Sequence, residues 1–312
     1  MARKILNNAA ALLLALACVM VQPWTAAQAQ DGLTRITDSV YAYVGVLEST
    51  PGNRFCANVG VVIGDDAVLV VDTLTSAKEA ELLLADIRKI TDKPVRWVVN
   101  THYHLDHSLG NCVFADQGAR IIGQEQCRAA LLASGETTLQ SGEAFGLEPE
   151  YWEGTRIAAP DLTFDSAVEV DLGNMAVRIF YPGHPSHSAG SSMVLVPSQD
   201  VLFTGDILFT DFHPFLGEAD LAGWAANLDE ITAMAPGIIV PGHGPLSDLE
   251  DVAALKDYLV FFDANAIELS RTMSDPEQIV AEMLNRLPQL VGGEFIVPMN
   301  IYTRYMPSQA AQ

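Results

Sequence analysis

Three of the seven histidines in this 312-residue chain fall within six positions, and no other feature constrains the fold as much. The segment NTHYHLDHSLGN, residues 100–111, contains His102, His104, Asp106 and His107. Residues 97–99, directly before it, are apolar and typical of a buried strand. We therefore expect the cluster on a loop at the carboxyl end of a strand, where α/β proteins commonly place their chemistry.

Three more motifs with histidine or aspartate follow apolar runs. YPGHPSHSAG contains His184 and His187, LFTGD ends at Asp206, and PGHGP contains His243. A single histidine near a strand end is more often a hydrogen-bonded surface or core residue than a ligand. Several such motifs, each after an apolar run, favour a metal site instead, because imidazole nitrogen and carboxylate oxygen are preferred zinc ligands.

The spacing within the first cluster suggests two metal ions. His102 and His104 are two residues apart, so on an extended loop they face the same way and can chelate one ion. Asp106 and His107 then point elsewhere and can serve a second ion. Asp206 could bridge the two, and a bridging hydroxide would then be available at neutral pH.

The rest of the chain alternates strand-like and amphipathic segments. Hairpins are predicted over 58–71, 168–181 and 193–203, a strand over 237–240, and helices over about 76–90, 221–235 and 249–273. This order predicts two mixed sheets between helices rather than a doubly wound parallel sheet. Residues 128–165 lack strong periodicity, and we interpret them as an insertion or loop region that could border a substrate cleft.

The first 29 residues have the pattern of a secretory signal peptide. Arg3 and Lys4 precede an apolar run over 9–21, and Ala27-Gln28-Ala29 fits a small-residue cleavage site. We expect a periplasmic or secreted protein. Cys18 lies in a poor lipoprotein cleavage box, so lipid anchoring is disfavoured, and no later segment is long and apolar enough to span a membrane.

Charge and cysteine content narrow the partners. The formal net charge of −22 disfavours nucleic acid, because phosphate binding needs clustered Lys and Arg. The expected partner is a small-molecule substrate, as for the hydrolase described below. Cys56, Cys112 and Cys127 remain beyond the signal segment, so at most one disulfide can form within the chain, and the sequence does not choose the pair. The oligomeric state is left open.

The motifs together resemble the metallo-β-lactamase superfamily. The match runs from about residue 38 to 246 through HYHLDH, HSAG, TGD and PGHG, with Asp72 at a further recurrent position. The resemblance implies an α+β fold, the αββα four-layer sandwich, and two Zn²⁺ per chain. His102, His104 and His187 would hold the first ion, Asp106, His107 and His243 the second, and Asp206 would bridge them.

Two further implications concern single residues. Asp106 would also orient the attacking water. His184 directly follows Pro-Gly, as the family's histidine often does, but His187 has the better downstream match and is the preferred ligand. Asp72 either supports a ligand histidine or simply ends its strand. Residues 30–312 are expected to form one domain, with helices from about residue 247.

The expected reaction is hydrolysis of a carboxylic ester, lactone or thioester by a bridging hydroxide. Family members that are β-lactamases usually have Cys or Ser where this chain has Asp206, which weakens that alternative, while export to the periplasm favours it. A mononuclear iron persulfide dioxygenase would use similar ligands. A non-catalytic accessory protein would be expected to have broken ligand motifs, and here the set is complete.

Overall fold

The computed structural model describes residues 32–142 and 147–306, and the predicted signal peptide lies outside them. The first sheet has seven strands in sequence order. They are β1 Thr34–Arg35, β2 Val40–Tyr43, β3 Val59–Ile63, β4 Val68–Val71, β5 Val95–Asn100, β6 Arg120–Gln124 and β7 Leu162–Phe164. The pairs from β1 to β4 are antiparallel and those from β4 to β7 are parallel.

The second sheet has five strands in the order β12-β11-β10-β9-β8. These are β8 Ala167–Asp171, β9 Ala176–Phe180, β10 Met193–Val196, β11 Val201–Phe209 and β12 Ile238–His243. Only the β11/β12 pair is parallel. Both sheets are therefore mixed, and the three predicted hairpins are confirmed.

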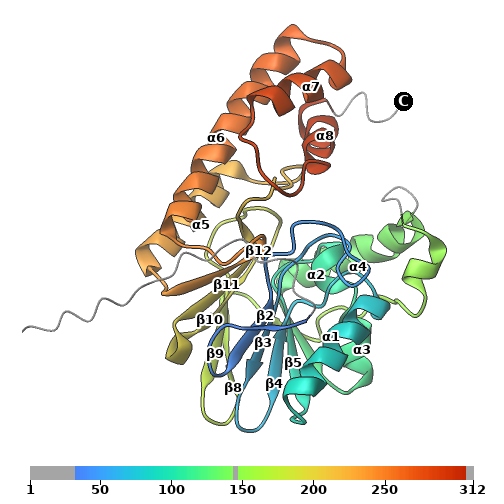
Figure 1. Cartoon of the computed structure of the whole chain (residues 1–312), viewed down its shortest axis with the longest axis vertical. Coiled ribbons are helices and arrows are strands. Elements are labelled where there is room, and N and C mark those ends of the chain that lie inside the picture. The colour runs from blue at the N-terminus through green and yellow to red at the C-terminus, as the bar shows by residue number, and fades with distance from the viewer. Residues whose placement is uncertain (1–31, 143–146, 307–312) are drawn as a thin grey trace, which may run out of the picture.

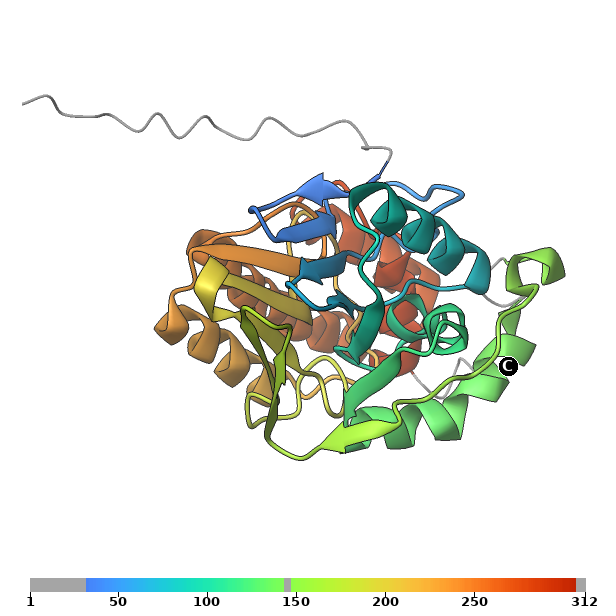
Figure 2. The same cartoon turned by 90° about the horizontal axis from the view of Figure 1, so that it is seen from below.

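Helices cover the outer faces of the two sheets, as Figures 1 and 2 show. The helices of the described residues are α1 Ala77–Ile90, α2 Leu105–Ser108, α3 Asn111–Asp116, α4 Glu125–Gln140, α5 Leu221–Met234, α6 Leu249–Thr272, α7 Pro276–Arg286 and α8 Ile296–Asn300. Short 3₁₀ turns lie at Pro149–Trp152 and Pro197–Gln199, and a π-helical turn follows α8 at Ile301–Tyr305. The predicted order of two mixed sheets between helices is confirmed.

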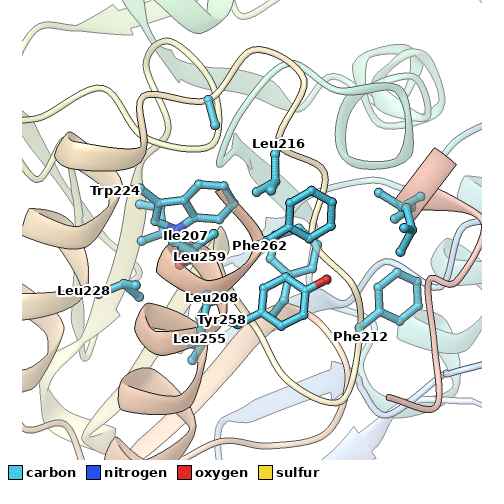
Figure 3. Close-up of a cluster of buried hydrophobic side chains, with 14 of the residues drawn as sticks. Ile207, Leu208, Phe212, Leu216, Trp224, Leu228, Leu255, Tyr258, Leu259 and Phe262 are labelled. Atoms are coloured by element: carbon cyan, nitrogen blue, oxygen red, sulfur yellow. Dashed lines mark hydrogen bonds between the residues drawn. The ribbon is translucent and has the colours of Figure 1, made fainter. Parts of the chain in front are cut away.

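Alternation along the strands builds the layers. In β4, Val68 and Val70 pack toward α1 and α3, while Leu69 and Val71 pack against the second sheet. Successive strand residues point to opposite faces, so a fully apolar strand fills two cores at once. A third buried cluster joins the second sheet to the C-terminal helices and includes Trp224 and Phe262, which Figure 3 shows together with Leu216.

The interpretation of residues 128–165 as irregular is wrong in its first third, and also at its end, where β7 pairs with β6. Helix α4 occupies Glu125–Gln140, with a buried face of Cys127, Leu131 and Gly135. That face is narrow and includes a glycine, so the apolar pattern of the segment does not reveal the helix. Part of it borders the apolar cleft described below.

No helix within residues 32–142 and 147–306 is both long and apolar enough to cross a membrane. After the last strand, α6 projects from the sandwich, and α7 and α8 fold back beside it (Figure 1). This helical projection lies at the end of the sandwich that carries the site, because α8 contributes to the cleft.

Candidate metal centre

Parallel strands bring the predicted ligands to one edge of the sandwich. In the first sheet, β4 and β5 run parallel, and β5 ends at Asn100, two residues before His102. In the second sheet, β11 carries Asp206 and the parallel strand β12 ends at His243. Carboxyl ends of parallel strands meet at the same sheet edge, so the two sheets deliver their polar residues to one place.

The described residues form two groups of mutually close ligand atoms. The first contains His102, His104, His187 and Asp206, and the second contains Asp106, His107 and His243. Within each group all ligand atoms lie within 4.8 Å of one another. The structure therefore divides the seven predicted ligands into the two sets expected from the sequence, with the shared Asp206 counted in the first.

In the first group, three imidazole nitrogens converge. Nδ1 of His104 lies 3.1 Å from Nε2 of His102 and 2.8 Å from Nε2 of His187. In the second group, Nε2 of His243 lies 3.4 Å from Nε2 of His107 and 3.3 Å from Oδ2 of Asp106.

Asp206 faces both groups, one oxygen to each. Its Oδ2 lies 3.1 Å from Nε2 of His187 and 3.6 Å from Nε2 of His102. Its Oδ1 lies 3.1 Å from Nε2 of His107 and 3.5 Å from Nε2 of His243. A carboxylate in this position can join two metal ions, which is the bridging arrangement inferred from the sequence.

Each of the five imidazoles uses its outer nitrogen to bind an acceptor. His102 pairs with the Thr101 hydroxyl, and His107 pairs with the Asp72 carboxylate. The others pair as follows: His104 with Glu218, His187 with the carbonyl of Phe215, and His243 with the carbonyl of Cys56. An outer N–H donated in this way fixes the tautomer and leaves the inner nitrogen a lone pair, as in metal-ligating histidines.

A cation fits this arrangement. Inner nitrogens with opposed lone pairs about 3 Å apart repel one another unless a proton or a metal ion lies between them. Oδ1 of Asp206 is also buried without a hydrogen-bond partner. A buried acceptor without a partner is costly, and metal coordination would satisfy it.

The pKa directions describe the same demand for positive charge. Burial alone would raise the pKa of Asp206, but the nearby imidazoles, His107 foremost, hold it well below its usual range. Burial alone would lower the pKa of His243, but the Asp206 and Asp106 carboxylates raise it to about 9. By contrast, burial holds the pKa of His102 well below the usual histidine value. The carboxylates thus stay ionised and attract a cation.

Asp72 lies beneath the ligands, in the left-handed region at φ +62°. It is 2% exposed, and its carboxylate accepts from the backbone N–H and the hydroxyl of Thr101 as well as from His107. Aspartate tolerates this conformation better than most residues. Of the two roles left open from the sequence, the contacts favour support of ligand histidines.

The remaining histidines lie outside both groups. His184 is exposed, and its carbonyl accepts from the Asn227 amide, so the geometry places His187 rather than His184 among the ligands. His213 is buried and pairs with the hydroxyl of Tyr258. Cys56, Cys112 and Cys127 are all buried and free, so the disulfide left open by the sequence is not formed among these three.

An apolar cleft of about 430 Å³ opens onto the candidate metal centre. Helix α4 contributes Leu131 to its wall, and the C-terminal segment contributes Phe295 and Met299. The aromatic side chains of Phe55, Phe209 and Phe215 also line it. Phe212 instead stacks on the His243 ring, with centroids 4.8 Å apart.

Two contributors were not found from the sequence. Glu218 binds His104 and the Tyr103 hydroxyl, and the Phe215 carbonyl binds His187. Both lie in an irregular segment after β11 with no motif of its own. The one signal was its position, because the segment directly follows the strand that carries Asp206.

Comparison with known proteins agrees with this geometry. The family model described as the metallo-beta-lactamase superfamily matches residues 53–243, which is more than half of the chain. The chain therefore belongs to the metallo-beta-lactamase superfamily. A solved metallo-beta-lactamase from Pontibacter korlensis superposes with a TM-score of 0.61 at 21% identity, covering 74% of this chain and 99% of that one. This confirms the αββα sandwich.

Relatives of known name have several activities. A linear primary-alkylsulfatase of Pseudomonas sp. (strain ATCC 19151) is 25% identical over 73% of this chain and 49% of its own. A metallo-beta-lactamase type 2 of Bacteroides fragilis is 23% identical over 74% and 86%. An acyl-coenzyme A thioesterase of Bos taurus is 26% identical over 62% and 74%. This chain thus spans about half the length of the alkylsulfatase.

Proposed function

We propose that the protein is an exported dinuclear zinc hydrolase that acts on the carbonyl of a carboxylic ester, lactone or thioester. The observation that carries this proposal is Asp206, whose two oxygens face two separate groups of histidines at the floor of an apolar cleft. When bound, two zinc ions would lower the pKa of water and polarise the substrate carbonyl. All seven ligands belong to this chain.

Asp106 is the residue best placed to handle the proton of the attacking water. It lines the cleft, and its Oδ2 lies 3.3 Å from Nε2 of His243 and 3.7 Å from Nε2 of His107. Burial would raise its pKa, but His107 foremost and then His243 lower it, so the carboxylate is ionised and can accept a proton.

The cleft supports an uncharged, apolar acyl group as the substrate. Its described lining contains no Lys or Arg, while Leu131, Phe295 and Met299 give it apolar walls. A negatively charged group away from the metals would find no cation to pair with, whereas an alkyl or aryl group would be removed from water at a gain of about 25 cal/mol per Å².

The test joins metal analysis to a hydrolysis panel. We would measure zinc per chain, then compare p-nitrophenyl esters of two and ten carbons, an acyl lactone, a thioester, a phosphodiester and a chromogenic cephalosporin. Two zinc ions per chain and a clear preference for the longer ester, lactone or thioester are expected. Phosphodiester turnover that exceeds all carbonyl substrates would contradict the proposal.

Two other activities have a specific observation in their favour. The similarity to a Bacteroides fragilis metallo-beta-lactamase keeps β-lactam hydrolysis as the runner-up, which fast cephalosporin turnover would establish. The similarity to a Pseudomonas alkylsulfatase, with the apolar cleft, supports hydrolysis of an alkyl sulfate. Dodecyl sulfate added to the panel tests this. About one iron per chain without hydrolysis would favour the persulfide dioxygenase alternative.

Export rests on the signal-like pattern of residues 1–29. If the pattern acts as a signal peptide, protein produced with the full sequence in a Gram-negative host will be recovered from the periplasm with Gln30 as its first residue. Amino-terminal sequencing of the purified protein measures this. Recovery in the cytoplasm with residues 1–29 intact would contradict export.

A further inference from the structure

A single irregular segment supplies outer acceptors to two ligands of the first group. We call residues 214–219 the Phe215 loop. The Phe215 carbonyl accepts from Nδ1 of His187 at 3.0 Å, and Oε1 of Glu218 accepts from Nε2 of His104 at 2.5 Å. The second group receives nothing from this loop, since His107 pairs with Asp72 and His243 with the Cys56 carbonyl.

The Phe215 loop does not set its own shape, because one buried side chain brackets it from outside. Asn300, fully buried at the end of α8, accepts from the backbone N–H of Leu216 at 2.6 Å and donates to the carbonyl of Pro214 at 2.9 Å. These two backbone groups lie on either side of Phe215. The amide of Asn300 therefore fixes the peptide units before and after the Phe215 Cα, and the second of these contains the Phe215 carbonyl itself.

A second side chain of the same C-terminal segment holds the far half of the loop. Arg304 donates to the carbonyl of Ala219 at 2.7 Å and to that of Leu216 at 3.2 Å. Leu216 itself is fully buried in the cluster that contains Val297 and Ile301. Polar and apolar contacts thus tie the loop to residues 296–304, more than 100 positions from His187 in sequence.

We propose that Asn300 and Arg304 are positioning residues for the first metal ion, acting through the Phe215 loop on His187 and His104. The inference rests on the proposed metal function. Acceptors beyond the ligands set ring orientation and ligand basicity, and their loss typically weakens metal binding 10- to 100-fold. A loop freed from Asn300 would let the Phe215 carbonyl turn away from His187.

The chain contains a matched control on the other side of the site. Asn58, 3% exposed, donates to the carbonyls of Pro241 and Gly244, both at 2.9 Å. It therefore brackets His243, a second-group ligand, as Asn300 brackets Phe215. Loss of either asparagine leaves buried backbone groups without a partner and carries a similar stability cost, while the two act on different metal ions.

The experiment is a stepwise zinc titration against a competing chelator, read as two successive dissociation constants. His187→Ala and His243→Ala identify which step belongs to which group. Asn300→Ala is then expected to weaken about tenfold the step that His187→Ala removes, while the other step changes less than twofold. Asn58→Ala should have the opposite pattern. Zinc binding is measured without substrate, so the result does not depend on which bond the enzyme hydrolyses.

Arg304→Gln keeps the experiment decisive if Asn300→Ala does not fold. Arg304 is only partly buried, so its loss should leave the fold intact and weaken the same step severalfold. The inference would be overturned if Asn300→Ala weakened both zinc-binding steps equally. It would also be overturned if neither Asn300→Ala nor Arg304→Gln changed either dissociation constant. Neither result would contradict the metal site itself. A wild-type protein that binds no zinc would overturn both proposals.

Discussion

The Asp72 carboxylate accepts a hydrogen bond from Nδ1 of His107 at 2.8 Å, with the two residues 35 positions apart and both buried. The same carboxylate accepts from the hydroxyl of Thr101 at 2.7 Å, which in turn is 3.1 Å from Nδ1 of His102. Asp72 therefore supports one ligand of each group, directly in one case and through Thr101 in the other.

Replacement of Asp72 should weaken both metal ions together. Asp72→Ala removes the acceptor for His107 and the partner of Thr101, so each stepwise zinc dissociation constant should rise about 10- to 100-fold. Chelator competition measures both constants. Asp65→Ala, at an exposed position on the turn before β4, is the control and should change neither. If only the dissociation constant of the second group rose, the Thr101 contact would have no role in supporting His102.

Asp106 provides a test of proton handling. Asp106→Asn keeps the shape of the side chain but cannot accept the proton of water, so turnover should fall about 10²- to 10⁴-fold. Zinc content should fall less, because His107 and His243 remain. Steady-state kinetics and metal analysis on one preparation make the comparison. Turnover above a tenth of the wild-type value would contradict the role of Asp106 in accepting a proton from water, but it would not contradict its place among the metal ligands.

The two candidate histidines of the YPGHPSHSAG segment make a matched pair. His187 is buried within 3.1 Å of Asp206, whereas His184 is exposed three residues earlier. His187→Ala should reduce zinc from two ions to one or fewer per chain, and His184→Ala should leave two. Metal analysis after desalting decides between them, and the reverse pattern would move the ligand to His184.

Most of the strand framework was predictable because it rests on local patterns. The apolar runs of β3, β4 and β11 and the Ser76 cap of α1 are local signals, and the ligand motifs mark strand ends. Helix α4 was missed because only a narrow face of it packs against the protein. Its helix is stabilised by the burial of one narrow face, which contains Cys127, Leu131 and Gly135, and the sequence has no clear amphipathic pattern that would predict it.

The contacts behind the ligands could not be predicted in the same way. The Phe215 carbonyl belongs to the backbone, and every residue type has one, so the residue at that position does not predict the contact with His187. Asn300 binds the Phe215 loop and Glu218 binds His104 only in the folded chain, because in each case the two partners are more than 80 positions apart in sequence. Asp72 was marked by its place at a strand end, but its three hydrogen bonds depend on how β4 and β5 pair.

Gly242 tests how closely β11 and β12 must approach. A Cβ there would lie 2.0 Å from Oδ1 of Asp206 and 2.8 Å from its backbone nitrogen. Gly242→Ala must therefore displace the bridging carboxylate or separate the strands, at a cost of about 1–3 kcal/mol in unfolding free energy. Zinc content should fall below two. Gly52→Ala is the control, because its Cβ would meet only Leu82, at 3.5 Å. If Gly242→Ala kept two zinc ions per chain, the bridging role of Asp206 would be contradicted.

His213 should make folding stability depend on pH independently of the metal ligands. Burial lowers its pKa to about 4, while the unfolded chain has the ordinary value of about 6.5. Between these values the unfolded state binds more protons, so the unfolding free energy must fall as pH decreases through this window and level off below pH 4. After allowance for solvent screening, the loss should be about 2 kcal/mol.

The comparison with His213→Gln isolates this contribution. Glutamine can still bond the Tyr258 hydroxyl, which lies 2.7 Å from Nδ1 of His213, but it does not titrate. Every other group that titrates on unfolding is common to both proteins, so it cancels in the difference between their unfolding free energies. Urea denaturation from pH 7.5 to pH 4 should therefore show that the unfolding free energy of the variant rises relative to that of wild type as pH falls. A difference that stays constant across this range would mean that His213 binds its proton equally well in the folded and unfolded states.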